Sequence, residues 1–123
     1  MKQRESELQQ SCIIYFHVQY PKFIIFATPN SQKRQIKTAK NGKKYCPSAQ
    51  RQKAEGLLPG VADLFIMEPR KGFHGFFIEM KTEKGKATEN QDWFLQAAHQ
   101  RGYKCSIIRS LDEFKNEVDS YFS

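Results

Sequence analysis

Two short apolar runs, residues 62–67 and 76–81, constrain the fold of this chain more than any other feature. Both are rich in residues that favour β-strands, and the loop between them has the length of a hairpin connection or slightly more. Side chains alternate between the two faces of a strand, so Glu79 and Lys81 share one face. Asp63 also lies at the start of an otherwise apolar run. The pattern predicts two neighbouring strands that carry charged side chains in apolar surroundings.

The charges of Asp63 and Glu79 need compensation, because a carboxylate in an apolar setting is costly. If the two strands are neighbours, the carboxylates converge near a strand end and repel unless a cation lies between them. Oxygen ligands with open positions suit Mg²⁺ or Mn²⁺ better than zinc, and such an ion would activate a water beside a phosphate. Lys81 would add positive charge next to that water. The alternative is that Asp63 is a turn residue and that Glu79 and Lys81 form an ordinary exposed pair.

The remaining segments predict an α/β domain, with a central mixed β-sheet flanked by helices, that spans residues 1–123. Helical spacing, capping patterns and short β-rich runs define its elements. Helices are expected over residues 5–19, 48–55, 88–101 and from 111 onwards, and strands over 23–27, 62–67, 76–81 and 104–109. The strand over 23–27 is expected to be buried. Residues 31–47 are polar and basic, with a turn at Asn41-Gly42 in a segment that otherwise indicates a loop or an arm.

Basic residues are unevenly distributed in this chain, which has a net charge of +7. Eight of them fall within residues 33–53, a stretch that contains no acidic residue, and the next acidic residue is Glu55. Such a cluster is either a solvated basic loop or a surface that faces phosphates.

The cysteines and the hydropathy pattern exclude other classes of protein. Cys12, Cys46 and Cys105 are too widely spaced for a zinc site, and we expect them to be reduced thiols. No apolar run has the length of a membrane span, and the polar first residues do not resemble a signal peptide. We therefore expect a cytoplasmic protein.

An ordered set of motifs resembles the VRR-NUC domain (virus-type replication-repair nuclease) of the P-D-(D/E)-x-K superfamily. The set comprises Gly60-Val61-Ala62-Asp63, Phe77-Ile78-Glu79-Met80-Lys81, Lys84-Gly85-Lys86 and Gln91. The resemblance covers nearly the whole chain, including Pro29-Asn30 and Gly102-Tyr103, and implies a restriction-endonuclease-like core. One position departs from the pattern, because Ala62 replaces the superfamily proline before the aspartate. Proline shapes the approach of the strand there and supplies no ligand.

The resemblance implies roles for the residues of the two strands. Asp63 and Glu79 would be metal ligands, with the Met80 backbone carbonyl assisting. Lys81 would be the catalytic lysine. The implied activity is that of a Mg²⁺- or Mn²⁺-dependent DNA endonuclease that leaves a 5′ phosphate. Small stand-alone members of phage or bacterial type favour branched DNA such as four-way junctions and resemble obligate homodimers, so we expect this substrate and this assembly here.

The resemblance also extends the site beyond the two strands. Gln91 matches a family glutamine, although its place in the capping box at residues 88–91 is a structural explanation of equal weight. A family glutamate on the first helix matches Glu5, which lies on the inward stripe of that helix, with Glu7 as the alternative. The residues expected to contact nucleic acid are Asn30, Lys33, Arg34, Lys37 and Lys86.

A different class of function is a basic nucleic-acid-binding module without catalysis. The segment from Lys33 to Lys53 supports it, and Phe23, Tyr45 and Trp93 are candidate stacking residues. Aromatic residues at helical or strand spacing more often belong to a core. The intact set of charged residues on the two strands favours an enzyme.

Overall fold

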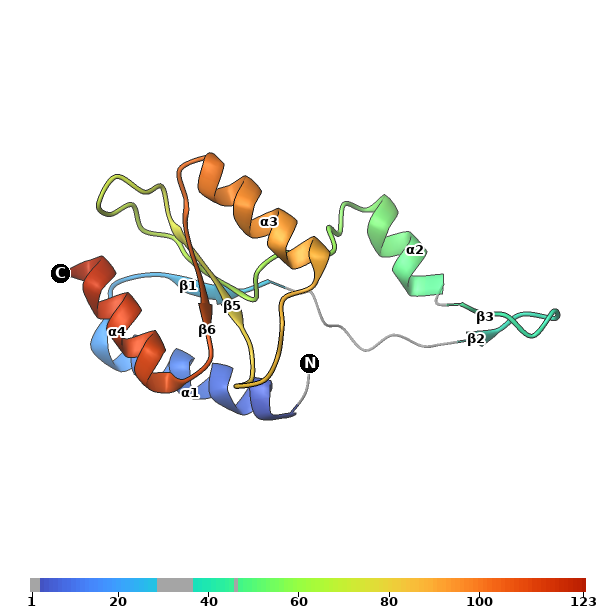
Figure 1. The fold of residues 1–123 in the computed structure, drawn as a ribbon, viewed down its shortest axis with the longest axis horizontal. Helices are drawn as coiled ribbons and strands as arrows, with labels where there is room; N and C mark the ends of the chain where they lie inside the picture. The colour runs from blue at the N-terminus through green and yellow to red at the C-terminus, as the bar shows by residue number, and fades with distance from the viewer. Residues whose placement is uncertain (1–2, 29–36, 46) are drawn as a thin grey trace.

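The computed structural model describes residues 3–28, 37–45 and 47–123 (Figure 1). In these ranges the elements follow the expected order, with two additional short strands. The helices are α1 (Gln3–Gln19), α2 (Pro47–Ala54), α3 (Glu89–Gln100) and α4 (Leu111–Phe122). The strands are β1 (Ile25–Ala27), β2 (Lys37–Thr38), β3 (Lys44–Tyr45), β4 (Leu64–Ile66), β5 (Phe76–Met80) and β6 (Lys104–Ile108). None of these helices is long and apolar enough to cross a membrane.

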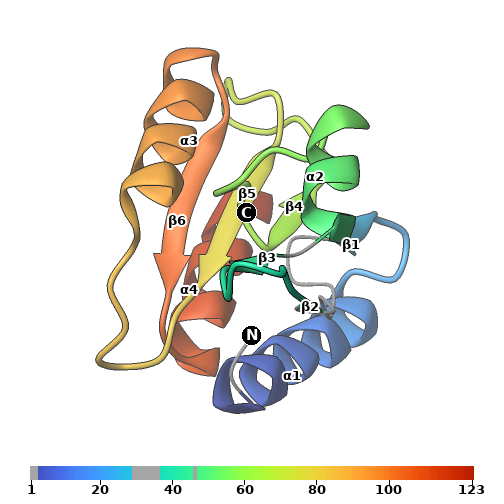
Figure 2. The same ribbon diagram turned by 90° about the vertical axis from the view of Figure 1, so that its right-hand side faces the viewer.

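A mixed sheet in the order β1-β4-β5-β6 forms the centre of the fold (Figures 1 and 2). β4 runs antiparallel to both β1 and β5, whereas β5 and β6 are parallel. The register of β4 and β5 pairs Leu64 with Ile78, which confirms the predicted pair of neighbouring strands. α1 and α4 cover one face of the sheet, and α3 packs on the other face.

The main core lies between the sheet and the layer formed by α1 and α4. Phe76, Ile78 and Met80 are fully buried there among side chains of the two helices. Phe77 points to the opposite face, where the centroid of its ring is 5.0 Å from that of Phe94 in α3. The predicted alternation along β5 is therefore confirmed, and the odd-numbered residues of this strand face α3.

The first strand differs from the predicted buried strand over residues 23–27. It spans only Ile25–Ala27 and lies at the edge of the sheet, paired with β4. Ile25 is buried, but the ring of Phe26 contacts Phe65 and is 45% exposed. A short apolar run does not distinguish an edge strand from a central one, because the difference depends on which strands pair with it.

Residues 37–45 form a hairpin where the sequence indicates only a loop or an arm. β2 and β3 pair antiparallel, and the predicted Asn41-Gly42 turn connects them. The Gly42 amide donates to the Ala39 carbonyl, and the φ of Gly42 is 82°, which glycine adopts without strain. The hairpin and α2 extend away from the sheet (Figure 1). We call residues 37–45 and 47–56 the arm.

Two predicted capping patterns define where the last two helices begin. Thr88 caps α3 in a reciprocal box with Gln91, and Ser110 caps α4 by accepting from the Glu113 amide. Gly102, with a φ of 92°, follows α3 and allows the turn into β6. The capping box orients the first turn of α3, so Gln91 faces the sheet.

Candidate active site

Asp63 and Glu79 converge where β4 begins and β5 ends. Asp63 directly precedes β4, and Glu79 is the fourth residue of β5. Because the antiparallel register pairs Leu64 with Ile78, the positions next to that pair face each other across the two strands. The Met80 amide donates to Asp63 Oδ2 over 2.8 Å and holds that carboxylate against β5. The expected convergence of the two carboxylates is therefore present.

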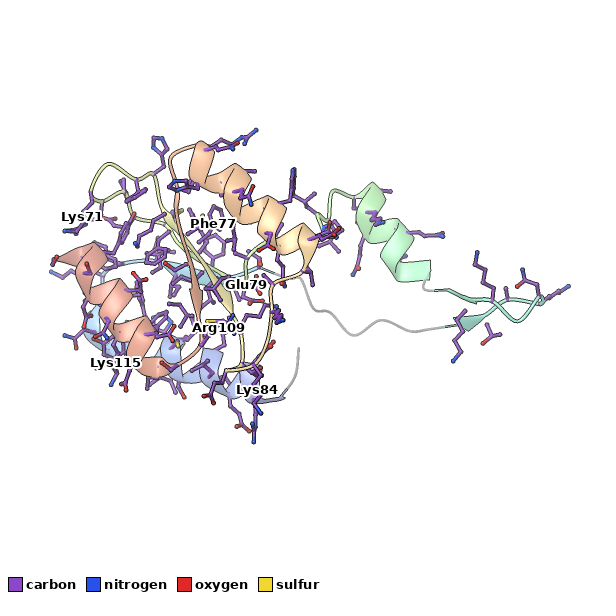
Figure 3. All side chains as sticks on the ribbon, in the orientation of Figure 1. Lys71, Phe77, Glu79, Lys84, Arg109 and Lys115 are labelled. Carbon is purple, nitrogen blue, oxygen red and sulfur yellow. The ribbon has the colours of Figure 1, made fainter. Side chains whose placement is uncertain are left out.

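Glu79 and Lys81 are buried together on the side of β5 that faces α3. Glu79 is 2% exposed and Lys81 is 8% exposed. Lys81 Nζ lies 3.5 Å from Glu79 Oε2. Figure 3 shows Glu79 near Phe77, between the sheet and α3. An ordinary exposed pair is therefore the wrong interpretation of these two residues.

The Glu79 carboxyl group has a strongly perturbed electrostatic setting. Burial and the neighbouring Asp63 carboxylate raise its pKa from the usual 4.5 to about 8, and Lys81 opposes this rise without cancelling it. Two adjacent carboxylates of this kind share a proton or bind a cation near neutral pH. Mg²⁺ is held in proteins by one or two carboxylates together with waters and substrate phosphates, and Mn²⁺ prefers similar oxygen ligands. The donor set therefore fits either ion.

Gln91 makes the capping contacts and a contact with the site at the same time. The Thr88 amide donates to Gln91 Oε1 over 2.9 Å, and the Gln91 amide donates to Thr88 Oγ1 over 3.2 Å. Gln91 Nε2 donates to Glu79 Oε2 over 3.1 Å. Because the cap occupies the side-chain oxygen, the NH₂ group is the part that faces the carboxylate. The two explanations of Gln91 are therefore compatible.

Thr28 and the first turn of α3 hold the segment before Asp63, where Ala62 stands at the position of the superfamily proline. Ala62 is fully buried, and its carbonyl accepts from the Thr28 hydroxyl. The Thr28 amide donates to the Asp63 carbonyl over 2.9 Å. Gly60, with a φ of 89°, packs against the first turn of α3, where an added Cβ would lie 2.5 Å from the Asn90 carbonyl carbon. The chain that follows β1 and the start of α3 thus determine how the chain enters β4.

Arg109 supports the site and is not among the residues predicted from the sequence. Its Nη1 donates to the carbonyl of Thr82 over 2.9 Å and to the carbonyl of Gly85. Both belong to the loop over residues 82–88, which follows Lys81. Gly85 lies against the stem of the lysine, since an added Cβ would be 3.5 Å from Lys81 Cδ. Arg109 therefore holds this loop in position behind Lys81.

No local pattern marks Arg109, because its position depends on strand pairing. β6 runs parallel to β5 with Met80 beside Ile108, so the residue after Ile108 emerges next to the end of β5. Figure 3 shows Arg109 between Glu79 and Lys84, which lies in the supported loop. Identifying Arg109 from the sequence would require knowing that β5 and β6 are adjacent and parallel.

The other predicted site residues are less closely connected to the carboxylate pair. Glu5 is half-buried in the first turn of α1 and Glu7 is exposed, in agreement with the predicted helical stripe. Among the residues that the structure describes, no third His, Cys, Asp or Glu joins Asp63 and Glu79 in a metal-binding group. Lys86 is exposed in the loop after β5, and Lys37 lies in β2. Outside the described residues lie Asn30, Lys33, Arg34 and Cys46.

The candidate stacking residues differ in their surroundings. Phe23 packs against Phe122 with the Arg70 guanidinium 5.3 Å above its ring, so it belongs to the core. Trp93 is 57% exposed on α3. Tyr45 lies in β3, and its side chain is outside the described part of the structure.

Comparison with known proteins gives a match over most of the chain. The sequence profile of the VRR-NUC domain matches residues 3–112. A solved structure described as a VRR_NUC domain protein is similar with a TM-score of 0.70 and 21% sequence identity, covering 98% of this chain and 89% of that chain. At this identity the likeness concerns the fold, and it confirms the expected α/β, restriction-endonuclease-like architecture. None of the curated proteins compared with the chain matches it.

Proposed function

This chain belongs to the VRR-NUC domain family of nuclease domains, and from that premise we propose that it is a Mg²⁺- or Mn²⁺-dependent deoxyribonuclease. The observation that carries the proposal is the buried Glu79 carboxylate, which faces the half-buried Asp63 and has Lys81 Nζ 3.5 Å away. Phosphodiester hydrolysis requires positive charge at the phosphate and an activated water. This set of residues is suited to provide both with a divalent cation.

Each residue of the site has a separate task in the proposed reaction. Asp63 and Glu79 would hold the divalent cation, with the Met80 carbonyl as a further oxygen ligand. The cation, when bound, supplies positive charge at the phosphate and lowers the pKa of water in the site. Lys81 donates to the attacking water and adds charge beside the phosphate, while Gln91 keeps Glu79 Oε2 in place. In-line attack of this water on phosphorus, with loss of its proton to solvent, breaks the bond to the 3′ oxygen. That oxygen takes up a proton, so the products are a 5′ phosphate and a 3′ hydroxyl group.

Cleavage of a DNA four-way junction in Mg²⁺ or Mn²⁺ tests this proposal. Asp63→Asn and Lys81→Met are expected to reduce the single-turnover rate by about 100-fold or more, because each removes charge used in the reaction. Lys22→Met changes an exposed lysine before β1 and should keep the wild-type rate. Circular dichroism shows whether each variant is folded. Cleavage that persists in both site variants would refute the assignment.

We further propose that the substrate is branched DNA and that the protein acts as a homodimer, as the family resemblance implies. Symmetric cleavage of a four-way junction requires two sites related by a two-fold axis. The assay compares a junction, a fork and a linear duplex of the same sequence, and sedimentation measures the mass of the protein alone and with the junction. A tenfold or greater preference for the junction and the mass of a dimer are expected. Equal rates on the linear duplex, or full activity as a monomer, would contradict these statements.

A binding module without catalysis is the alternative, favoured by the exposed basic residues of the arm. Calorimetry with Mn²⁺ separates the two functions. The nuclease is expected to bind the ion at a site that Asp63→Asn removes, whereas a binding module would show no specific uptake at the carboxylates. The salt dependence of DNA binding does not discriminate, because both functions require contacts with phosphates.

A further inference from the structure

The net positive charge of the chain is concentrated in one segment. Residues 33–55 contain eight of the twenty Lys and Arg residues and one of the thirteen Asp and Glu residues. The rest of the chain is electrically balanced, with twelve residues of each sign. The charge of +7 that attracts a polyanion is therefore a property of this segment, most of which forms the arm.

The arm presents its charges to solvent. Its exposed cations are Lys40, Lys43, Lys44, Arg51 and Lys53. The Arg51–Glu55 ion pair, at 3.9 Å, is itself exposed and contributes little. In the core, by contrast, three cations lie against glutamates in partly or fully buried ion pairs. No arm side chain whose burial is described is buried, so packing in the protein does not explain the arm.

The base of the arm lies beside the candidate active site. After α2 the chain turns at Gly60, which packs against Asn90 in the first turn of α3. The next residue of that turn, Gln91, donates to Glu79 over 3.1 Å. Figures 1 and 2 show the arm leaving the core at this end of α3. A nucleic-acid backbone held along the arm therefore leads to the carboxylate pair.

We propose that the arm is the phosphate-binding element of this protein and that the neutral core cleaves DNA while contributing little to affinity. The inference rests on the proposed function, because it assumes a DNA substrate. Lysine and arginine side chains on an exposed hairpin and helix bind phosphates irrespective of base sequence, and they release condensed counterions when they do so. Affinity and catalysis are thus separate properties of two parts of the chain.

Two double variants with the same change in net charge test the proposal. The arm variant is Lys43→Gln with Lys44→Gln, and the control is Lys71→Gln with Lys115→Gln. Figure 3 shows Lys71 and Lys115 on the side of the core away from the arm. Both pairs are placed in an Asp63→Asn background, so that binding to a DNA four-way junction is measured by fluorescence anisotropy without cleavage.

The arm variant is expected to bind the junction about tenfold more weakly at physiological salt. It should also reduce the slope of log K against log salt concentration by about 2, because each phosphate contact contributes about 0.9. The control variant should keep both the affinity and the slope. Equal losses in the two variants would show that total charge matters and not the arm, and no loss in the arm variant would equally overturn the proposal.

Cleavage by the same double variants with Asp63 intact separates this inference from the proposed function. If both are correct, the arm variant has a higher KM and an unchanged kcat at saturating DNA. If the wild-type protein binds DNA but never cleaves it, the proposed function fails, and the anisotropy result still decides the role of the arm. A reduced kcat at saturating DNA would place the arm in the chemical step and overturn the separation of affinity from catalysis.

Discussion

Replacing Arg109 by methionine should loosen the loop behind Lys81 and slow cleavage without changing metal binding. Arg109 donates to three carbonyls, those of Thr82, Glu83 and Gly85. A hydrogen bond from a charged donor contributes about 1.5–3 kcal/mol when buried. The bond to Glu83 is long, at 3.5 Å, and these groups are only partly buried, so water replaces part of the loss. We therefore expect Arg109→Met to cost about 2 kcal/mol, or a fall in Tm of roughly 6–10 °C.

The expected effect on catalysis follows from the contact between Gly85 and the stem of Lys81. A displacement of the lysine by about 1 Å would reduce the single-turnover rate by about 10- to 100-fold. Mn²⁺ affinity should not change, because Arg109 contacts neither Asp63 nor Glu79 in the described structure. Arg109→Lys should recover only part of the rate, since an ammonium group does not have the planar fork of donors of a guanidinium.

Arg101 offers a matched control for this experiment. Its Nη1 also donates to a backbone carbonyl, that of Ala97, over 2.9 Å, but at an exposed position near the end of α3. Arg101→Met should cost less than about 0.5 kcal/mol and leave cleavage unchanged. Thermal melts, single-turnover cleavage at a temperature where every variant is folded, and calorimetry with Mn²⁺ supply the data. If Arg109→Met melts lower but cleaves at the wild-type rate, Arg109 is purely structural and the reasoning is wrong.

Three further predictions concern charge, backbone and burial. Without metal, the folded protein keeps a proton on Glu79 that the unfolded chain releases near pH 4.5, so Tm should fall as the pH rises from about 5 to about 8. Glu79→Gln should abolish that fall in thermal melts, and a Tm independent of pH in the wild-type protein would contradict the raised pKa. Gly60→Ala should lower the free energy of unfolding by about 2–4 kcal/mol in denaturant titration, because the added Cβ would clash with the Asn90 backbone. Gly72 has a similar φ of 84° but no atom within 4 Å of an added Cβ, so Gly72→Ala should cost about 1 kcal/mol. Equal costs would exclude the close approach of Gly60 to Asn90. Gln9 Oε1 is buried without a hydrogen-bond partner in the described structure, so Gln9→Met should raise the free energy of unfolding by about 1 kcal/mol in the same titration. A lower free energy of unfolding would show that this oxygen accepts a hydrogen bond in the folded protein.

Much of this protein follows from local patterns in its sequence. Strand alternation places Glu79 and Lys81 on one face, because successive side chains of any β-strand point in opposite directions. The capping box that begins at Thr88 defines the start of α3, since the contacts that make it are all within four residues. The Asn41-Gly42 turn likewise depends on the backbone freedom of glycine. These features do not require knowledge of distant neighbours.

The tertiary structure decided the strand register and the strand pairings beyond the predicted pair of β4 and β5. Asp63 faces Glu79 because of the register between β4 and β5, and that proximity together with burial produces the raised pKa of Glu79. Arg109 reaches the loop behind Lys81 because β6 runs parallel to β5. The run at 23–27 became an edge strand for the same kind of reason. Strand pairing depends on how all the elements pack together, whereas alternation, caps and turns depend only on adjacent residues.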